Sequence, residues 1–100
     1  MPSESVIRKK AIEILNNNGW VTWHPARARF KQNDVFGIID LLAAKKRSLK
    51  KIQLTTVANI STKRKKIINF LKENKIQMAI EIWAWSQKEK KFRKEKINLT

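Results

Sequence analysis

A single carboxylate, Asp40, lies in the middle of an almost unbroken apolar run, FGIIDLLAA, at residues 36–44. An ionised carboxylate in apolar surroundings is costly unless a partner offsets its charge. One possible partner is a cation of the protein itself, such as Lys51 or an arginine of the segment before the run. The other is a metal ion, since hard divalent cations bind carboxylate oxygens. Asp40 is therefore the first candidate for metal chemistry, with a structural ion pair as the alternative.

A second polar residue, Gln53, is expected to face Asp40 across a hairpin. Residues 35–44 and 49–57 read as neighbouring strands joined by a short polar turn. In a tight antiparallel hairpin Asp40 lies opposite Gln53, and Lys51 lies one step away on the same face. Direct cross-strand partners point to the same side of a sheet, so a carboxylate and an amide carbonyl would meet there. A glutamine that merely binds a neighbouring residue is the alternative.

The charge of the chain points to a polyanionic partner. Lys and Arg number 23 against eight Asp and Glu, which gives a formal net charge of +15. Such an excess is typical of nucleic-acid-binding proteins. A heat-adapted surface is the alternative, but it usually enriches glutamate alongside lysine. The basic residues gather in a predicted loop and at the start of a predicted helix: Arg27, Arg29 and Lys31, and Lys63, Arg64 and Lys66.

Length and composition exclude several classes of protein. One hundred residues suit a single domain, residues 1–100, with one core. The absence of cysteine and the presence of one histidine, His24, give zinc sites and Cys- or His-based nucleophiles little support. No apolar stretch approaches the ~18 residues that span a membrane, and the first ten residues are too polar for a signal peptide. We therefore expect a cytoplasmic protein.

Hydrophobic spacing predicts the element order αβββαββ, an α/β or α+β domain with a mixed sheet. Ser3 is expected to cap the first helix, and Ser61 or Thr62 the second. The last strand is rich in lysine, which suits an exposed sheet edge. The predicted helices cover residues 4–18 and about 61–74, and the predicted strands cover residues 20–24, 35–44, 49–57, 78–85 and 92–99.

Other residues that could carry function have a plainer interpretation. The four tryptophans are expected in the core or at a dimer surface, with base stacking as the alternative: Trp20, Trp23, Trp83 and Trp85. Glu4 and Glu13 lie on the first predicted helix, where a solvated face is more plausible than a metal site. Asp34 precedes the Asp40 strand as a turn residue or an outer ligand.

Two short segments together resemble a nuclease family. They are DVFGIIDLLA at residues 34–43 and IQLTT at residues 52–56. Their order and spacing are similar to those of the PD-(D/E)XK nuclease superfamily, and in particular to a small branch resembling archaeal Holliday-junction resolvases. The resemblance extends over about residues 4–97 and includes the IWAW strand at 82–85.

This resemblance implies a restriction-endonuclease-like αβββαβ core that binds Mg²⁺ or Mn²⁺ and hydrolyses DNA phosphodiesters. It implies that Asp40 anchors the metal, that Gln53 and the Leu54 carbonyl complete the protein ligands, and that Asp34 is a further candidate ligand. Lys51 would then steady the phosphate during cleavage. The implied partners are branched or duplex DNA and a second copy of the chain.

Two positions depart from the family pattern. Gln53 stands where the superfamily has an acidic residue, and Thr55 stands where it has a lysine. A glutamine oxygen can bind a hard cation but brings no charge, so Mg²⁺ affinity should fall. The missing lysine could be replaced by Lys51 or by a basic residue of positions 63–66. A degenerate nuclease fold that only binds nucleic acid is the alternative, and an unrelated RNA-binding protein is a third possibility.

Overall fold

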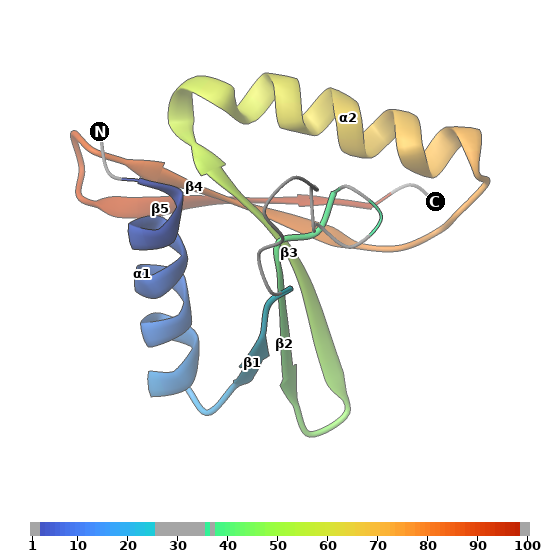
Figure 1. The fold of residues 1–100 in the computed structure, drawn as a ribbon. Helices are drawn as coiled ribbons and strands as arrows, with labels where there is room; N and C mark the ends of the chain where they lie inside the picture. The colour runs from blue at the N-terminus through green and yellow to red at the C-terminus, as the bar shows by residue number, and fades with distance from the viewer. Residues whose placement is uncertain (1–2, 26–35, 37, 99–100) are drawn as a thin grey trace.

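The structure, a computed structural model, describes residues 3–25, 36 and 38–98. A five-stranded mixed sheet carries one helix on each face (Figure 1). Neither helix in this part of the chain is long and apolar enough to cross a membrane. The elements are α1 (Glu4–Asn17), β1 (Val21–Trp23), β2 (Leu41–Lys45), β3 (Ser48–Thr56), the 3-10 turn η1 (Val57–Asn59), α2 (Ile60–Glu73), β4 (Ile80–Ser86) and β5 (Lys91–Ile97).

The strands lie side by side in the order β1-β2-β3-β4-β5. The first three form an antiparallel meander, β4 lies parallel to β3, and β5 returns antiparallel to β4. The parallel pair requires a crossover connection, and η1 with α2 provides it. The predicted order αβββαββ and the mixed sheet are both confirmed.

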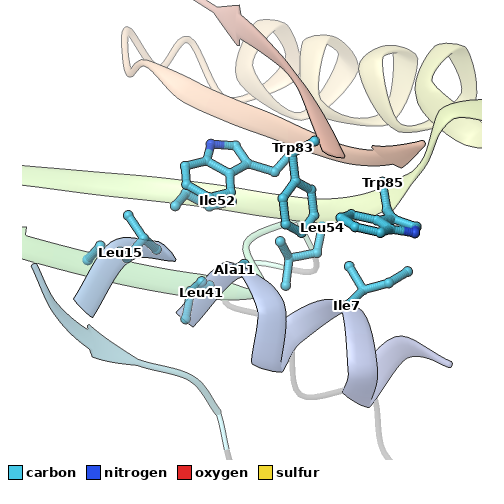
Figure 2. Packing of buried hydrophobic residues seen from close by; sticks show 10 residues of the cluster. Ile7, Ala11, Leu15, Leu41, Ile52, Leu54, Trp83 and Trp85 are labelled. Carbon is cyan, nitrogen blue, oxygen red and sulfur yellow. The ribbon is translucent and has the colours of Figure 1, made fainter. Parts of the chain in front are cut away.

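Helix α1 packs its apolar stripe on one face of the sheet. Ile7, Ala11 and Leu15 recur at helical spacing and are all buried. The Ser3 side chain accepts a hydrogen bond from the Val6 N–H at 3.4 Å, which confirms the predicted cap. Figure 2 shows the stripe against the residues of three strands: Leu41, Ile52, Leu54, Trp83 and Trp85.

Helix α2 covers the other face. Its buried residues Ile67 and Leu71 pack in a second cluster with isoleucines of β4, β5 and the segment before β2. The predicted cap at Ser61 or Thr62 is wrong, because the helix begins at Ile60 after Asn59. The preceding 3-10 turn explains the difference, since the Ile60 N–H already bonds the Val57 carbonyl.

The strand that follows Asp40 is shorter than predicted. The prediction began at Val35, whereas β2 begins at Leu41, and residues 35 and 37 lie outside the described part. Phe36 has a φ of 55°, which breaks extended structure, and its ring lies 5.6 Å from that of Phe70 on α2. The strand was also predicted to be buried on both faces as far as Ala44, but Ala44 is exposed.

The register of the β2–β3 hairpin agrees with the prediction. Leu42 pairs with Lys51, and the connection is the two-residue turn Lys46-Arg47 between Lys45 and Ser48. Lys46 has a φ of 54°, as tight hairpin turns require. A slip of one residue would move every side chain of β2 to the other face. The turn therefore determines what faces Asp40.

Candidate functional site

Asp40 is bound to β3 by three hydrogen bonds. Its Oδ2 accepts one from Gln53 Nε2 at 2.6 Å and one from the Leu54 backbone N–H at 2.8 Å. Its own N–H donates to the Ile52 carbonyl at 2.9 Å. These bonds fix the carboxylate on the face of the sheet that α2 covers, immediately before β2 begins. The hairpin thus brings Asp40 and Gln53 together as expected.

The Gln53 side chain is buried, with 2 % of its surface exposed. Its Nε2 donates to Asp40 and makes a longer contact of 3.3 Å with the Leu54 carbonyl. Its Oε1 is buried and has no hydrogen-bond partner in the described part of the chain. An unsatisfied buried acceptor costs about 1–3 kcal/mol. The amide is therefore only half satisfied in this arrangement.

The three oxygen donors near this amide suit a hard cation. They are the Asp40 carboxylate, the Leu54 carbonyl and the orphaned Gln53 Oε1. A half-turn of the Gln53 amide would exchange its nitrogen and its oxygen, and Oε1 would then lie beside the Asp40 carboxylate and the Leu54 carbonyl, while the Leu54 N–H keeps its bond to Asp40. A cation among these three oxygens would offset their mutual repulsion. Mg²⁺ sites with one carboxylate often use substrate phosphates as further ligands, so the residues fit a weak Mg²⁺ or Mn²⁺ site.

A metal site built from acidic or histidine side chains alone is not found. In residues 3–25, 36 and 38–98, no three His, Cys, Asp or Glu side chains group to hold a metal ion. Any site at Asp40 must therefore use amide and backbone oxygens. Asp34 was a candidate ligand and lies outside the described residues, as do Arg27, Arg29 and Lys31 of the predicted basic loop.

Lys51 and Thr55 flank Gln53 on the same face of β3. Alternation along the strand places all three side chains on the α2 side of the sheet. Lys51 is half-buried next to Leu42, whereas Thr55 is buried with 8 % of its surface exposed. Lys51 is thus the basic residue that the hairpin register places one step from Gln53 on the same face, as predicted.

The basic residues at the start of α2 differ in their surroundings. Arg64 forms two hydrogen bonds with Glu95 of β5, both at 2.7 Å. This pairing raises the pKa of Arg64, and the hydrogen bond from Arg64 lowers the pKa of Glu95. Lys63 is half-buried and Lys66 is exposed. The first turn of α2 holds no acidic residue, so these cations meet the positive end of the helix dipole.

The tryptophans separate into a core group and one exposed residue. Trp83 and Trp85 are buried around Phe92, and Trp20 is half-buried beneath the Lys50 ammonium group at 5.1 Å. Trp23 keeps 55 % of its surface exposed. The predicted core position is therefore confirmed for Trp83 and Trp85, whereas for the exposed Trp23 the other part of the prediction, a dimer surface, stays a prediction. No local sequence pattern distinguishes Trp23 from the two buried tryptophans.

The partly buried ion pair of Lys50 with Glu81 was not predicted from the sequence. Lys50 Nζ lies 2.8 Å from Glu81 Oε2, and Trp83 Nε1 donates to Glu81 Oε1 at 3.2 Å. The pair joins β3 to β4 on the α1 face. It follows from the register of the parallel strands, which places Ile52 beside Glu81 and which no local pattern reveals.

Comparisons of the chain with family models, with curated proteins and with solved structures found no match.

Proposed function

We propose that this protein is a DNA-binding, metal-dependent endonuclease of the PD-(D/E)XK type with a weakened metal site. The observation that carries the proposal is the meeting of Asp40, the Gln53 amide and the Leu54 carbonyl. The order of an antiparallel hairpin, a crossover helix and a parallel strand supports the αβββαβ core of that superfamily.

Each residue has a distinct task in this proposal. Asp40 anchors the ion, the Gln53 Oε1 and the Leu54 carbonyl complete the protein ligands, and substrate phosphates supply the rest. Bound Mg²⁺ or Mn²⁺ activates water and neutralises charge on the phosphate under attack. The Lys51 ammonium group stabilises the phosphate oxygens, and Lys63 and Lys66 hold neighbouring phosphates.

A second candidate function is favoured by the same amide. Gln53 Nε2 donates to Asp40 at 2.6 Å, so a hydrogen-bond donor already offsets the carboxylate without any metal. A glutamate in the same place would repel Asp40. A nuclease fold that lost cleavage but retained DNA binding could carry an amide in place of the acid, as this chain does at Gln53. A nucleic-acid-binding module is therefore the alternative function.

Cleavage assays separate the two. The wild type and Asp40→Asn would be incubated with branched, duplex and single-stranded DNA in Mg²⁺, in Mn²⁺ and in EDTA. The nuclease proposal expects metal-dependent products from the wild type and none from the variant, which preserves the shape of the side chain. Binding without cleavage of any substrate in either metal would favour the binding module.

A further inference from the structure

An apolar patch continues the candidate site along the sheet. Register places Trp23, Leu42 and Lys51 in one cross-strand row, and Val21, Ala44 and Leu49 in the next. Both rows point to the α2 face, as do Asp40 and Gln53. We refer to the five apolar residues of these two rows, Val21, Trp23, Leu42, Ala44 and Leu49, as the apolar patch.

The apolar patch is open to solvent. Its three largest exposed members keep more than half of their surface accessible: Val21 at 74 %, Trp23 at 55 % and Leu49 at 53 %. In Figure 1 the β2–β3 hairpin extends away from α2, which packs on β3, β4 and β5. Large apolar side chains gathered in this way on an open sheet face mark an interaction surface.

The surroundings of the apolar patch are positively charged. Lys51 lies within its rows, and Lys46 and Arg47 are exposed at the turn of the hairpin. No acidic side chain of residues 3–25, 36 and 38–98 belongs to these rows. A partner for this surface must therefore be both anionic and apolar.

A second copy of the chain does not meet this requirement. If two such surfaces met about a twofold axis, Lys51 and Arg47 of one copy would approach the same cations of the other. Like charges at a contact are unfavourable, and the patch offers no carboxylate to offset them. Unpaired nucleotides do meet it, since each one combines a phosphate with an aromatic face that stacks on tryptophan.

We propose that the apolar patch binds unpaired nucleotides of single-stranded DNA. A base stacks on Trp23, neighbouring bases contact Val21 and Leu49, and phosphates lie at Lys51 and at the basic hairpin turn, Lys46 and Arg47. The row of Lys51 adjoins that of Gln53, so the strand leads to Asp40. The inference rests on the DNA-binding part of the proposed function and names its substrate as DNA with an unpaired segment.

Binding assays in EDTA test this inference through Trp23. The wild type, Trp23→Phe, Trp23→Leu and Trp23→Ala would be titrated against labelled single-stranded DNA and against the duplex of the same sequence. Loss of one stacked base should weaken single-strand binding about tenfold in the leucine and alanine variants. The phenylalanine variant keeps a ring and should remain near the wild type. Duplex affinity should be unchanged in all of them.

Two controls make the result specific. Val6→Ala removes an exposed apolar side chain from α1 on the other face and should change neither affinity. Sedimentation would show whether Trp23→Ala alters the oligomeric state. Equal losses for single strands and duplex, or equal behaviour of Trp23→Leu and Trp23→Phe, would overturn the inference. So would conversion of a dimer to a monomer, which would assign the patch to a second copy. Because no metal is present, a failure to cleave DNA leaves this test unaffected.

Discussion

Gln53 donates an amide hydrogen to the Asp40 carboxylate over 2.6 Å. The amide has two opposite consequences. Its nitrogen satisfies the carboxylate without a metal, and its oxygen is left buried without a hydrogen bond from the described residues. The first stabilises a metal-free protein, and the second favours a cation. Which of them dominates can be measured by changing either residue.

Replacing Gln53 by glutamate should make the folded state dependent on metal. Two carboxylates within a few ångströms repel each other, and one of them should keep its proton to an unusually high pH. The Gln53→Glu protein should therefore melt at a lower temperature than the wild type in EDTA near neutral pH. Mg²⁺ or Mn²⁺ binds the folded state and should restore that stability.

Melting temperatures of both proteins in EDTA and in each metal provide the measurement. A larger metal-dependent rise in the glutamate variant supports a shared ligand pair. A simultaneous gain of cleavage would identify the wild type as a weakened nuclease. If neither metal moved either melting curve, Asp40 and Gln53 would not share a cation site.

Replacing Asp40 should separate binding from cleavage. Asp40→Ala leaves the Leu54 N–H and the Gln53 amide without their acceptor, which should cost about 1–3 kcal/mol of unfolding free energy. Asp40→Asn keeps an acceptor and should cost less. Both variants should lose metal-dependent cleavage, and both should bind DNA as tightly as the wild type or more tightly, because a negative charge is gone. Urea denaturation and anisotropy would test this, and wild-type cleavage by either variant would contradict it.

The pairing of Arg64 with Glu95 should contribute stability that depends on pH. The pKa of Glu95 is lowered by the hydrogen bond from Arg64, so the contribution is present above the ordinary value of 4.5. It should be lost as the pH falls through the lowered pKa. Both side chains are more than a third exposed, so solvent screening keeps the effect small. The Glu95→Gln protein should unfold at a lower urea concentration than the wild type at neutral pH, and the difference should shrink in acid.

A matched control for that experiment is Glu73→Gln, which removes an exposed carboxylate at the end of α2. It changes the net charge by the same amount and leaves the Arg64 pairing intact. The two variants should therefore differ in how their urea midpoints vary with pH. Identical pH profiles would show that the Glu95 carboxylate contributes only through net charge.

The basic start of α2 should determine part of the salt dependence of DNA binding. Each phosphate neutralised on duplex DNA adds about −0.9 to the slope of log affinity against log salt concentration. Lys66→Gln should reduce the magnitude of that slope by about this amount if Lys66 contacts a phosphate. Lys9→Gln changes an exposed lysine of α1 on the other face and should leave the slope unchanged. Equal slopes for all three proteins would remove α2 from the DNA-binding surface.

The part of the fold that could be predicted depended on local rules. The pairing of Asp40 with Gln53 followed from a short turn and from the alternation of side chains, because a two-residue hairpin has few possible registers. The apolar stripe of α1 was also predictable, because the spacing of its buried residues is a local property of a single helix. The start of α2 was missed, because the 3-10 turn Val57–Asn59 runs directly into the helix, which therefore begins at Ile60 without a side-chain cap.

The features that could not be predicted depend on contacts between distant segments. The ion pairs Lys50–Glu81 and Arg64–Glu95 each join residues thirty-one positions apart. The first depends on the parallel register of β3 and β4, and the second depends on where α2 packs against β5. The exposure of Trp23 depends on how far α2 extends over the sheet. Sequence alone gave Trp23 the same expected position as Trp83, and only packing separates the two.

The hairpin that carries Asp40 also has a consequence for how the protein folds. Asp40 and Gln53 stand thirteen positions apart, and a hairpin closes in about 1–10 μs. The parallel pairing of β3 with β4 must wait until η1 and α2 have crossed over, and such distant pairings form slowly. Asp40 and Gln53 should therefore meet early in folding. An isolated two-stranded hairpin is only marginally stable, so the packing of the helices then stabilises it. Substitutions that slow the crossover should delay the appearance of native protein without altering which side chain faces Asp40.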